Sequence, residues 1–187
     1  MNKLIDVKNT GEKIKNEFYL IELKDELKHN SNNKNEKIKN VLNFSIDDNF
    51  PIFLKRDLAN IKVEQELEIY RSKHFSHLPS RCACLYVFQN FGDLHSAMMK
   101  YNWHGKIFKI TIDTTKEYIV SKHNMEIIST LRDSSFQAIN RNQILNYYWS
   151  GANFPLQYAN IQFSFLPISE YLIEGEFTYS ELKNVSI

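Results

Sequence analysis

The chain has 187 residues, of which 43% are hydrophobic and 24% are charged, and its formal net charge is +1. This length is sufficient for one domain with a substantial core and is short for two domains. The proportions are those of a globular protein and exclude a disordered chain. The near-neutral charge argues against a protein that coats nucleic acid through bulk charge, although it allows a local nucleic-acid site.

The cysteines and the apolar runs indicate the cellular setting. The two cysteines, Cys82 and Cys84, are too close in sequence for a useful disulfide loop. No uncharged run approaches the roughly 20 residues that a membrane span needs, and residues 1–18 lack the apolar core of a signal peptide. We therefore expect a reducing, cytoplasmic location and no membrane partner.

The first part of the chain alternates short apolar runs with polar segments. Residues 17–23 predict a short strand or the start of a helix, and the asparagine-rich residues 28–41 are typical of an exposed polar loop. A turn is expected around residues 47–51. A helix is expected over residues 63–73, where Val63, Leu67 and Tyr70 share one face.

The pattern changes after Pro79, which disfavours helix at the residue before it. Residues 82–88 are uncharged, and such a run is typical of a strand buried on both faces. Further elements are expected in chain order: a helix starting near Asp93, a strand over 105–113, a short extended piece over 116–122, one or two helices within 124–151 closed by Gly151, and two or three strands within 157–182 with a turn at Gly175. The order predicts a single α+β domain over residues 1–187, with most strands in its second half.

Arg81 and the glutamates near the C-terminus are the first candidates for chemistry. Arg81 precedes the apolar run 82–88, and its planar guanidinium suits a phosphate as well as it suits a surface carboxylate. Glu170 stands at the entrance of a predicted strand, a position where a carboxylate often lines a cleft. Glu174 and Glu176 follow at alternating positions, where charges at the edge of a strand are ordinarily solvated. The pattern alone does not rank these three glutamates.

Other side chains have both a functional and a structural interpretation. His74, His77, Cys82 and Cys84 have a spacing that resembles a zinc site, but C-x-C within an apolar strand has poor geometry for zinc. We therefore expect core cysteines and no metal. Trp149, in the aromatic run 146–151, is typical of a helix packed into the core, and it could instead lean over a flat ligand. Five cations before residue 57 are either phosphate contacts or solvated charges: Lys28, Lys34, Lys37, Lys39 and Arg56.

Several catalytic motifs are absent from the sequence. With five glycines, the chain has no glycine-rich phosphate loop and no Walker lysine. It also lacks the G-x-S-x-G and H-E-x-x-H motifs.

Three stretches resemble the ADP-ribosyltransferase superfamily, in particular bacterial toxin-type members that include DNA-modifying enzymes. They are LPSRCACLYVF (78–88), GKIFKITID (105–113) and ISEYLIEGEFTYSEL (168–182), and the resemblance covers residues 63–182. In that group an arginine ahead of a strand contacts NAD, and a glutamate in a motif similar to SEYLI is catalytic. The first strand of the superfamily commonly carries His or Arg, which residues 17–23 lack.

The resemblance implies a split mixed and antiparallel sheet core with flanking helices, and NAD as co-substrate. Glu170 would stabilise an oxocarbenium-like state and orient a ribose hydroxyl. Arg81 would hold the pyrophosphate with help from Ser80, and Tyr86 or Trp149 would stack on nicotinamide or adenine. Glu174 and Glu176 can be aligned with the Q/E-x-E signature of arginine-modifying relatives, but we favour Glu170 because it enters the strand.

The expected function is therefore an NAD-dependent ADP-ribosyltransferase that releases nicotinamide, as a toxin or phage-defence effector. Its target would be DNA or RNA in preference to protein, and an antitoxin would neutralise it. A second interpretation keeps the fold and changes the reaction to that of an RNA 2′-phosphotransferase or an NAD hydrolase. A third is a catalytically degenerate relative that binds a partner through the loop at 28–41.

Overall fold

The computed structural model describes residues 3–4, 16–22, 58–132, 140–152, 157–158, 161–162 and 167–183. The predicted loop at 28–41 and the predicted turn at 47–51 lie outside these ranges. The same holds for five basic candidates: Lys28, Lys34, Lys37, Lys39 and Arg56. The described residues form a mixed arrangement of helices and mainly antiparallel strands. The predicted α+β class is therefore confirmed.

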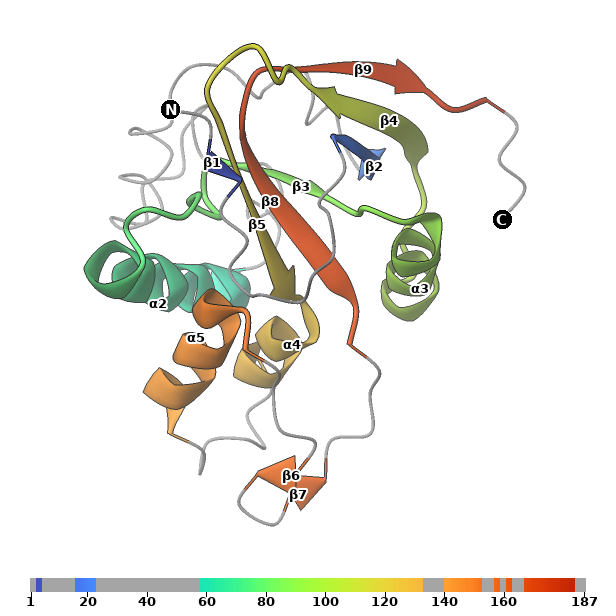
Figure 1. Cartoon of the computed structure of the whole chain (residues 1–187). Coiled ribbons are helices and arrows are strands. Elements are labelled where there is room, and N and C mark those ends of the chain that lie inside the picture. Colours follow the sequence, from blue (N-terminus) through green and yellow to red (C-terminus); the bar gives the residue numbers. More distant parts are fainter. Residues whose placement is uncertain are drawn as a thin grey trace.

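Most of the strands belong to two sheets (Figure 1). One sheet has the order β1 (Lys3–Leu4), β5 (Tyr118–Asn124), β8 (Ser169–Gly175) and β3 (Leu85–Val87). Only β1 and β5 pair in parallel there, while β8 is antiparallel to both β5 and β3. The sheet therefore places β8, which carries Glu170, directly beside the strand that follows Arg81.

The second sheet is antiparallel and has the order β2 (Glu17–Glu22), β4 (Lys106–Ile112) and β9 (Phe177–Glu181). Tyr19 and Phe88 exchange two backbone hydrogen bonds of 2.7 Å and so join this sheet to the end of β3. The short strands β6 (Gln157–Tyr158) and β7 (Ile161–Gln162) pair with each other.

The helices lie on both sides of the strands (Figure 1). They are α2 (Leu58–His74), α3 (Phe91–Tyr101), α4 (Glu126–Arg132) and α5 (Arg141–Ser150). Helices α2, α4 and α5 pack together beside β5 and β8, and α3 lies near β2 and β4. Gly151 ends α5 with a φ of 63°, which confirms the predicted C-cap, since glycine adopts this conformation without strain. Within the described residues, no helix combines the length and the apolar character that a membrane crossing requires.

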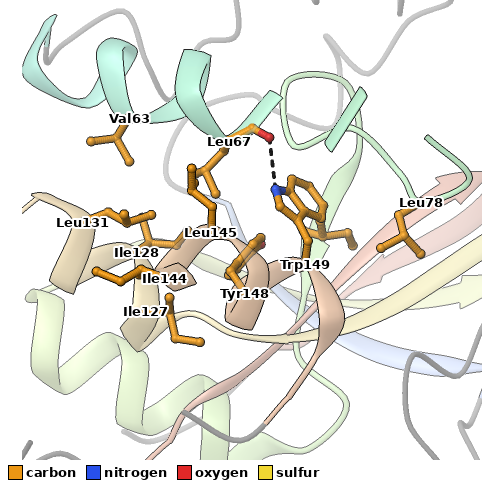
Figure 2. Packing of buried hydrophobic residues seen from close by; sticks show 11 residues of the cluster. Val63, Leu67, Leu78, Ile127, Ile128, Leu131, Ile144, Leu145, Tyr148 and Trp149 are labelled. Atoms are coloured by element: carbon orange, nitrogen blue, oxygen red, sulfur yellow. Dashed lines mark hydrogen bonds between the residues drawn. The ribbon is translucent and has the colours of Figure 1, made fainter. Parts of the chain in front are cut away.

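Two apolar clusters lie on opposite faces of β8. The buried side chains of α2, α4 and α5 pack against one another in one cluster (Figure 2), and Leu172 belongs to this cluster. Tyr171 and Ile173 point the other way, into the core between the two sheets. Since side chains alternate along a strand, Glu170 shares the face of Leu172 and points toward the helices. The strand therefore presents a carboxylate to the helical layer.

The strand predicted over 82–88 is shorter in the structure. Residues 81–84 form a turn, in which the backbone N–H of Ala83 donates to the carbonyl of Ser80 at 3.0 Å, and β3 begins at Leu85. The side-chain oxygen of Ser80 also accepts a hydrogen bond from the N–H of Cys82 at 3.2 Å. These local bonds compete with strand pairing and direct Arg81 inward.

Candidate active site around Arg81 and Glu170

The structure brings Arg81 and Glu170 into direct contact although they are far apart in sequence. The Nη1 atom of Arg81 lies 2.6 Å from Oε1 of Glu170, and both side chains are almost fully buried. Arg81 comes from the turn before β3, and Glu170 is the second residue of β8. The register of β3 and β8 pairs Leu85 with Ile173, so Glu170 lies toward the end of β3 that is farther from Arg81. The turn at 81–84 directs the Arg81 side chain inward, toward this carboxylate.

Tyr148 of α5 is the third member of this contact. Nη1 of Arg81 donates to the Tyr148 hydroxyl at 2.5 Å, and that hydroxyl donates to Oε1 of Glu170 at 2.7 Å. Among the described residues, no group donates a hydrogen bond to the other oxygen of Glu170, Oε2. One oxygen of the carboxylate is thus fixed by two donors, while the second remains available as an acceptor.

Glu64 of α2 occupies the other side of the Arg81 guanidinium. Oε2 of Glu64 accepts from Nε at 2.9 Å and Oε1 accepts from Nη2 at 3.2 Å, which is a bidentate, side-on pair. Glu64 is fully buried in the structure. Arg81 is therefore held between two carboxylates, one from α2 and one from β8.

A second buried pair anchors the turn that carries Arg81. The hydroxyl of Ser80 donates to Oε2 of Glu68 at 2.7 Å, and Arg71 binds the same carboxylate, with Nη2 at 2.6 Å from Oε1. Arg71 also donates to the carbonyl of Leu78 at 2.9 Å. Ser80, proposed from the sequence as a helper in phosphate binding, here ties the turn to α2.

The electrostatics of the cluster explain how so many charges are buried. Burial alone would lower the pKa of Arg81, but the carboxylates of Glu170 and Glu64 raise it well above its ordinary value. Burial raises the pKa of Tyr148 well above its ordinary value, so its hydroxyl keeps its proton and can donate it to Glu170. Within the described residues, every fully buried polar side-chain atom has a hydrogen-bond partner. Removing one partner would therefore leave a buried charge uncompensated.

The two aromatic candidates lie in different places. The ring of Tyr86 lies 4.8 Å from the guanidinium carbon of Arg81, a cation–π contact. Its hydroxyl donates to the Arg81 carbonyl, so Tyr86 belongs to the cluster. Trp149 is fully buried, and its indole N–H donates to the carbonyl of Leu67 at 3.0 Å (Figure 2). The indole therefore has no face exposed to a ligand in this conformation.

His123 supports Tyr148 from the sheet side. Its ring stacks on the Tyr148 ring at 4.6 Å between centroids, and its Nδ1 lies 2.9 Å from the Tyr148 carbonyl. Because a carbonyl only accepts, Nδ1 carries the hydrogen, and Nε2 accepts from the Ser121 hydroxyl at 2.7 Å. Burial lowers the pKa of His123 to about 3, so the ring is neutral.

The zinc-like set does not converge in the structure. His74 and His77 are exposed around the end of α2, whereas Cys82 lies in the core. Burial raises the pKa of both Cys82 and Cys84, which keeps them as thiols. Within the described parts of the chain, no three His, Cys, Asp or Glu side chains are grouped so that they could hold a metal ion.

The residues that hold Arg81 and its turn in place were not predicted from the sequence. Glu64, Glu68 and Arg71 follow one another at helical spacing, so a second face of the predicted helix carries the charges of the cluster beside the apolar face. Charges on a helix are usually solvated, and for this reason their spacing attracted no functional interpretation. Tyr148 was hidden in an aromatic run that indicated core packing.

Comparison with known proteins places nearly the whole chain in one family. The model of a family described as a protein of unknown function (DUF2441) matches residues 1–184. The chain belongs to this family. The match extends over the turn with Arg81, the three helices around it and the strand with Glu170, so the cluster lies entirely within the family's region. No curated protein matches the chain.

Proposed function

We propose that this protein is an NAD-dependent ADP-ribosyltransferase whose active site is the cluster of Arg81, Tyr148 and Glu170. The observation that carries the proposal is the contact of 2.6 Å between Arg81 and Glu170, the two residues that the resemblance to the superfamily singles out. The two main sheets with their flanking helices are compatible with the split-sheet core of that superfamily. In the part of the chain that the structure describes, no group donates to Oε2 of Glu170, so this oxygen can serve as the acceptor that the proposed reaction uses.

In this proposal Glu170 stabilises the positive charge that develops when the bond between nicotinamide and ribose breaks. Its Oε2 accepts a ribose hydroxyl or the proton of the incoming nucleophile, and nicotinamide leaves. Tyr148 and Arg81 fix the carboxylate through Oε1, so that its orientation is set before substrate arrives. Arg81 also supplies a guanidinium for the pyrophosphate.

The proposed target is DNA or RNA in preference to protein, and the proposed setting is a toxin or phage-defence effector in the cytoplasm with a neutralising antitoxin. The resemblance to toxin-type enzymes supports this part of the proposal. The same cluster is also compatible with an RNA 2′-phosphotransferase or an NAD hydrolase, because both reactions act on a ribose with an anionic substituent. Analysis of the products separates these reactions.

A second candidate function is that of a catalytically degenerate binding module. Arg81 contacts Glu64, Glu170 and Tyr148, and the Arg81 side chain is only 6% exposed. Strand β2 (EFYLIE) also carries neither the His nor the Arg that the first strand of the superfamily commonly offers. These observations favour a fold that has kept the cluster for stability and binds a partner elsewhere.

The experiment that separates the two functions follows the adenylate label of NAD. The purified protein is incubated with labelled NAD and a cell extract, and the label is measured separately in DNA, RNA and protein. The variant Glu170→Gln is compared with Glu174→Gln, which makes the same change four residues along β8, on the same face. We expect label in one fraction, retained by Glu174→Gln and lost by Glu170→Gln. Absence of label and of nicotinamide release with the folded wild-type protein would favour the binding module.

A further inference from the structure

Glu64 is bound by two guanidinium groups that come from different parts of the fold. Arg81 binds it side-on from the turn before β3, and Nη2 of Arg132, the last residue of α4, lies 3.4 Å from Oε1. Glu64 itself belongs to α2. A single carboxylate therefore holds together three elements that meet around the candidate site.

The position of Glu64 has the character of an anion-binding site. A guanidinium binds a phosphate with the same two-pronged geometry that it uses for a carboxylate. A second guanidinium from another element fits a ligand with more than one anionic oxygen. Glu64 thus stands where a phosphate oxygen pair would stand if α2 were displaced.

A negative group at this position balances the charges of both arginines. Without Glu64, Arg81 would keep Glu170 as its ionic partner, and Arg132 would lose the carboxylate that it contacts. A buried charge is costly unless it is paired. The carboxylate of α2 supplies the balancing charge from within the chain.

Arg132 is the most exposed member of this contact. The side chain of Arg132 is 36% exposed, whereas those of Glu64 and Arg81 are 0% and 6% exposed. A soluble anion can therefore reach Arg132 first and then compete for Arg81. No movement of the sheet is needed, because β8 contributes only the opposite side of the guanidinium.

We propose that Arg81 and Arg132 form a binding site for a pyrophosphate or phosphate ester, and that Glu64 fills this site as an internal anion until such a ligand displaces it. For the reaction the inference rests on the proposed function, where the ligand is the pyrophosphate of NAD. The anion site itself is tested without any turnover. Displacement of Glu64 frees α2 from Arg81 and opens the candidate site.

The internal anion lowers the apparent affinity for the ligand, because only the fraction of molecules with Glu64 displaced can bind. Minor conformations of this kind typically have populations of about 0.1–10%. Removing the competing charge should therefore tighten binding by about tenfold or more. The substitution Glu64→Gln keeps the shape of the side chain and removes the charge.

The test measures the binding of inorganic pyrophosphate and of ADP by calorimetry, in the wild type and in variants. Glu66→Gln is the matched control, since Glu66 lies two residues along α2 and pairs with Arg141 at 2.5 Å. We expect Glu64→Gln to bind both probes at least about tenfold more tightly than the wild type. Glu66→Gln should not differ from the wild type. Adding Arg132→Gln to Glu64→Gln should abolish most of the gain.

If Glu64→Gln does not fold, Glu64→Asp replaces it. The shorter side chain of aspartate keeps the charge but weakens the contact with both arginines. We then expect an intermediate gain in affinity for pyrophosphate and ADP. A folded variant with wild-type affinity overturns the inference, as does a gain that Arg132→Gln leaves intact. If the protein turns over NAD but Glu64→Gln binds pyrophosphate with wild-type affinity, the inference that Glu64 acts as an internal anion is wrong and the proposed function is retained. Tighter pyrophosphate binding without NAD turnover would support the anion site and contradict the transferase.

Discussion

Removing the hydroxyl of Tyr148 tests whether the buried cluster stabilises the fold as its geometry implies. In Tyr148→Phe the ring is kept, so the stacking on His123 and the packing of α5 remain. The variant lacks two hydrogen bonds of the Tyr148 hydroxyl: the one that it accepts from Arg81 at 2.5 Å and the one that it donates to Glu170 at 2.7 Å. Each hydrogen bond to a charged group contributes about 1.5–3 kcal/mol. Because Arg81 and Glu170 still bind each other, we expect a loss of about 2–4 kcal/mol in the free energy of unfolding.

The assay is equilibrium unfolding in urea, with the slope of the transition checked against the wild type. Tyr179→Phe is the control, because Tyr179 is 52% exposed on β9 and loss of its hydroxyl should cost less than about 0.5 kcal/mol. If both variants changed stability equally little, the Tyr148 hydroxyl would not be part of a stabilising network, and the account of the cluster would be wrong.

Two further predictions concern Arg81 and His123. Arg81→Lys should lower Tm by about 10 °C, because one ammonium group cannot bind Glu64 side-on and Glu170 at the same time. Calorimetry measures this Tm, and a value within about 2 °C of the wild type would refute the prediction. The pKa of His123 is about 3 in the folded state, below its ordinary value of 6.5, so between these values the unfolded chain binds a proton that the folded chain does not. Stability should therefore fall on acidification below about pH 6.5, by about 1.4 kcal/mol per pH unit for this group. Urea unfolding at pH 4–6 should show a steeper pH dependence for the wild type than for His123→Phe, and equal slopes would contradict a buried neutral ring.

The regular elements could be predicted because their local signals agree with the tertiary structure. The alternation in residues 105–113 became β4 (Lys106–Ile112), and the glycine at 151 ended α5. The turn at 81–84 was not predicted, because uncharged residues favour a strand while Ser80 and the Arg81 carbonyl make local bonds that break it. Competition between a local hydrogen bond and a strand is not visible in hydrophobicity alone.

Two residues of the candidate site could be predicted from the sequence, but the side chains that contact them could not. Arg81 and Glu170 were each singled out from the sequence, and the structure places them 2.6 Å apart. Their other partners, Glu64 and Tyr148, come from helices whose charged and aromatic residues have ordinary structural explanations. Which side chain of a helix turns toward a buried arginine depends on how α2 and α5 pack, and that is decided by contacts distant in sequence.

The most direct test of the central claim is nicotinamide release from NAD by the purified protein, measured with Glu170→Gln and Glu174→Gln in parallel. The account predicts release by the wild type and by Glu174→Gln, and a reduction of at least about a hundredfold in Glu170→Gln, because the loss of a group that stabilises developing charge costs this much. Both variants must first be shown to be folded under the conditions of the assay. Equal release by Glu170→Gln and Glu174→Gln would contradict a catalytic role for Glu170.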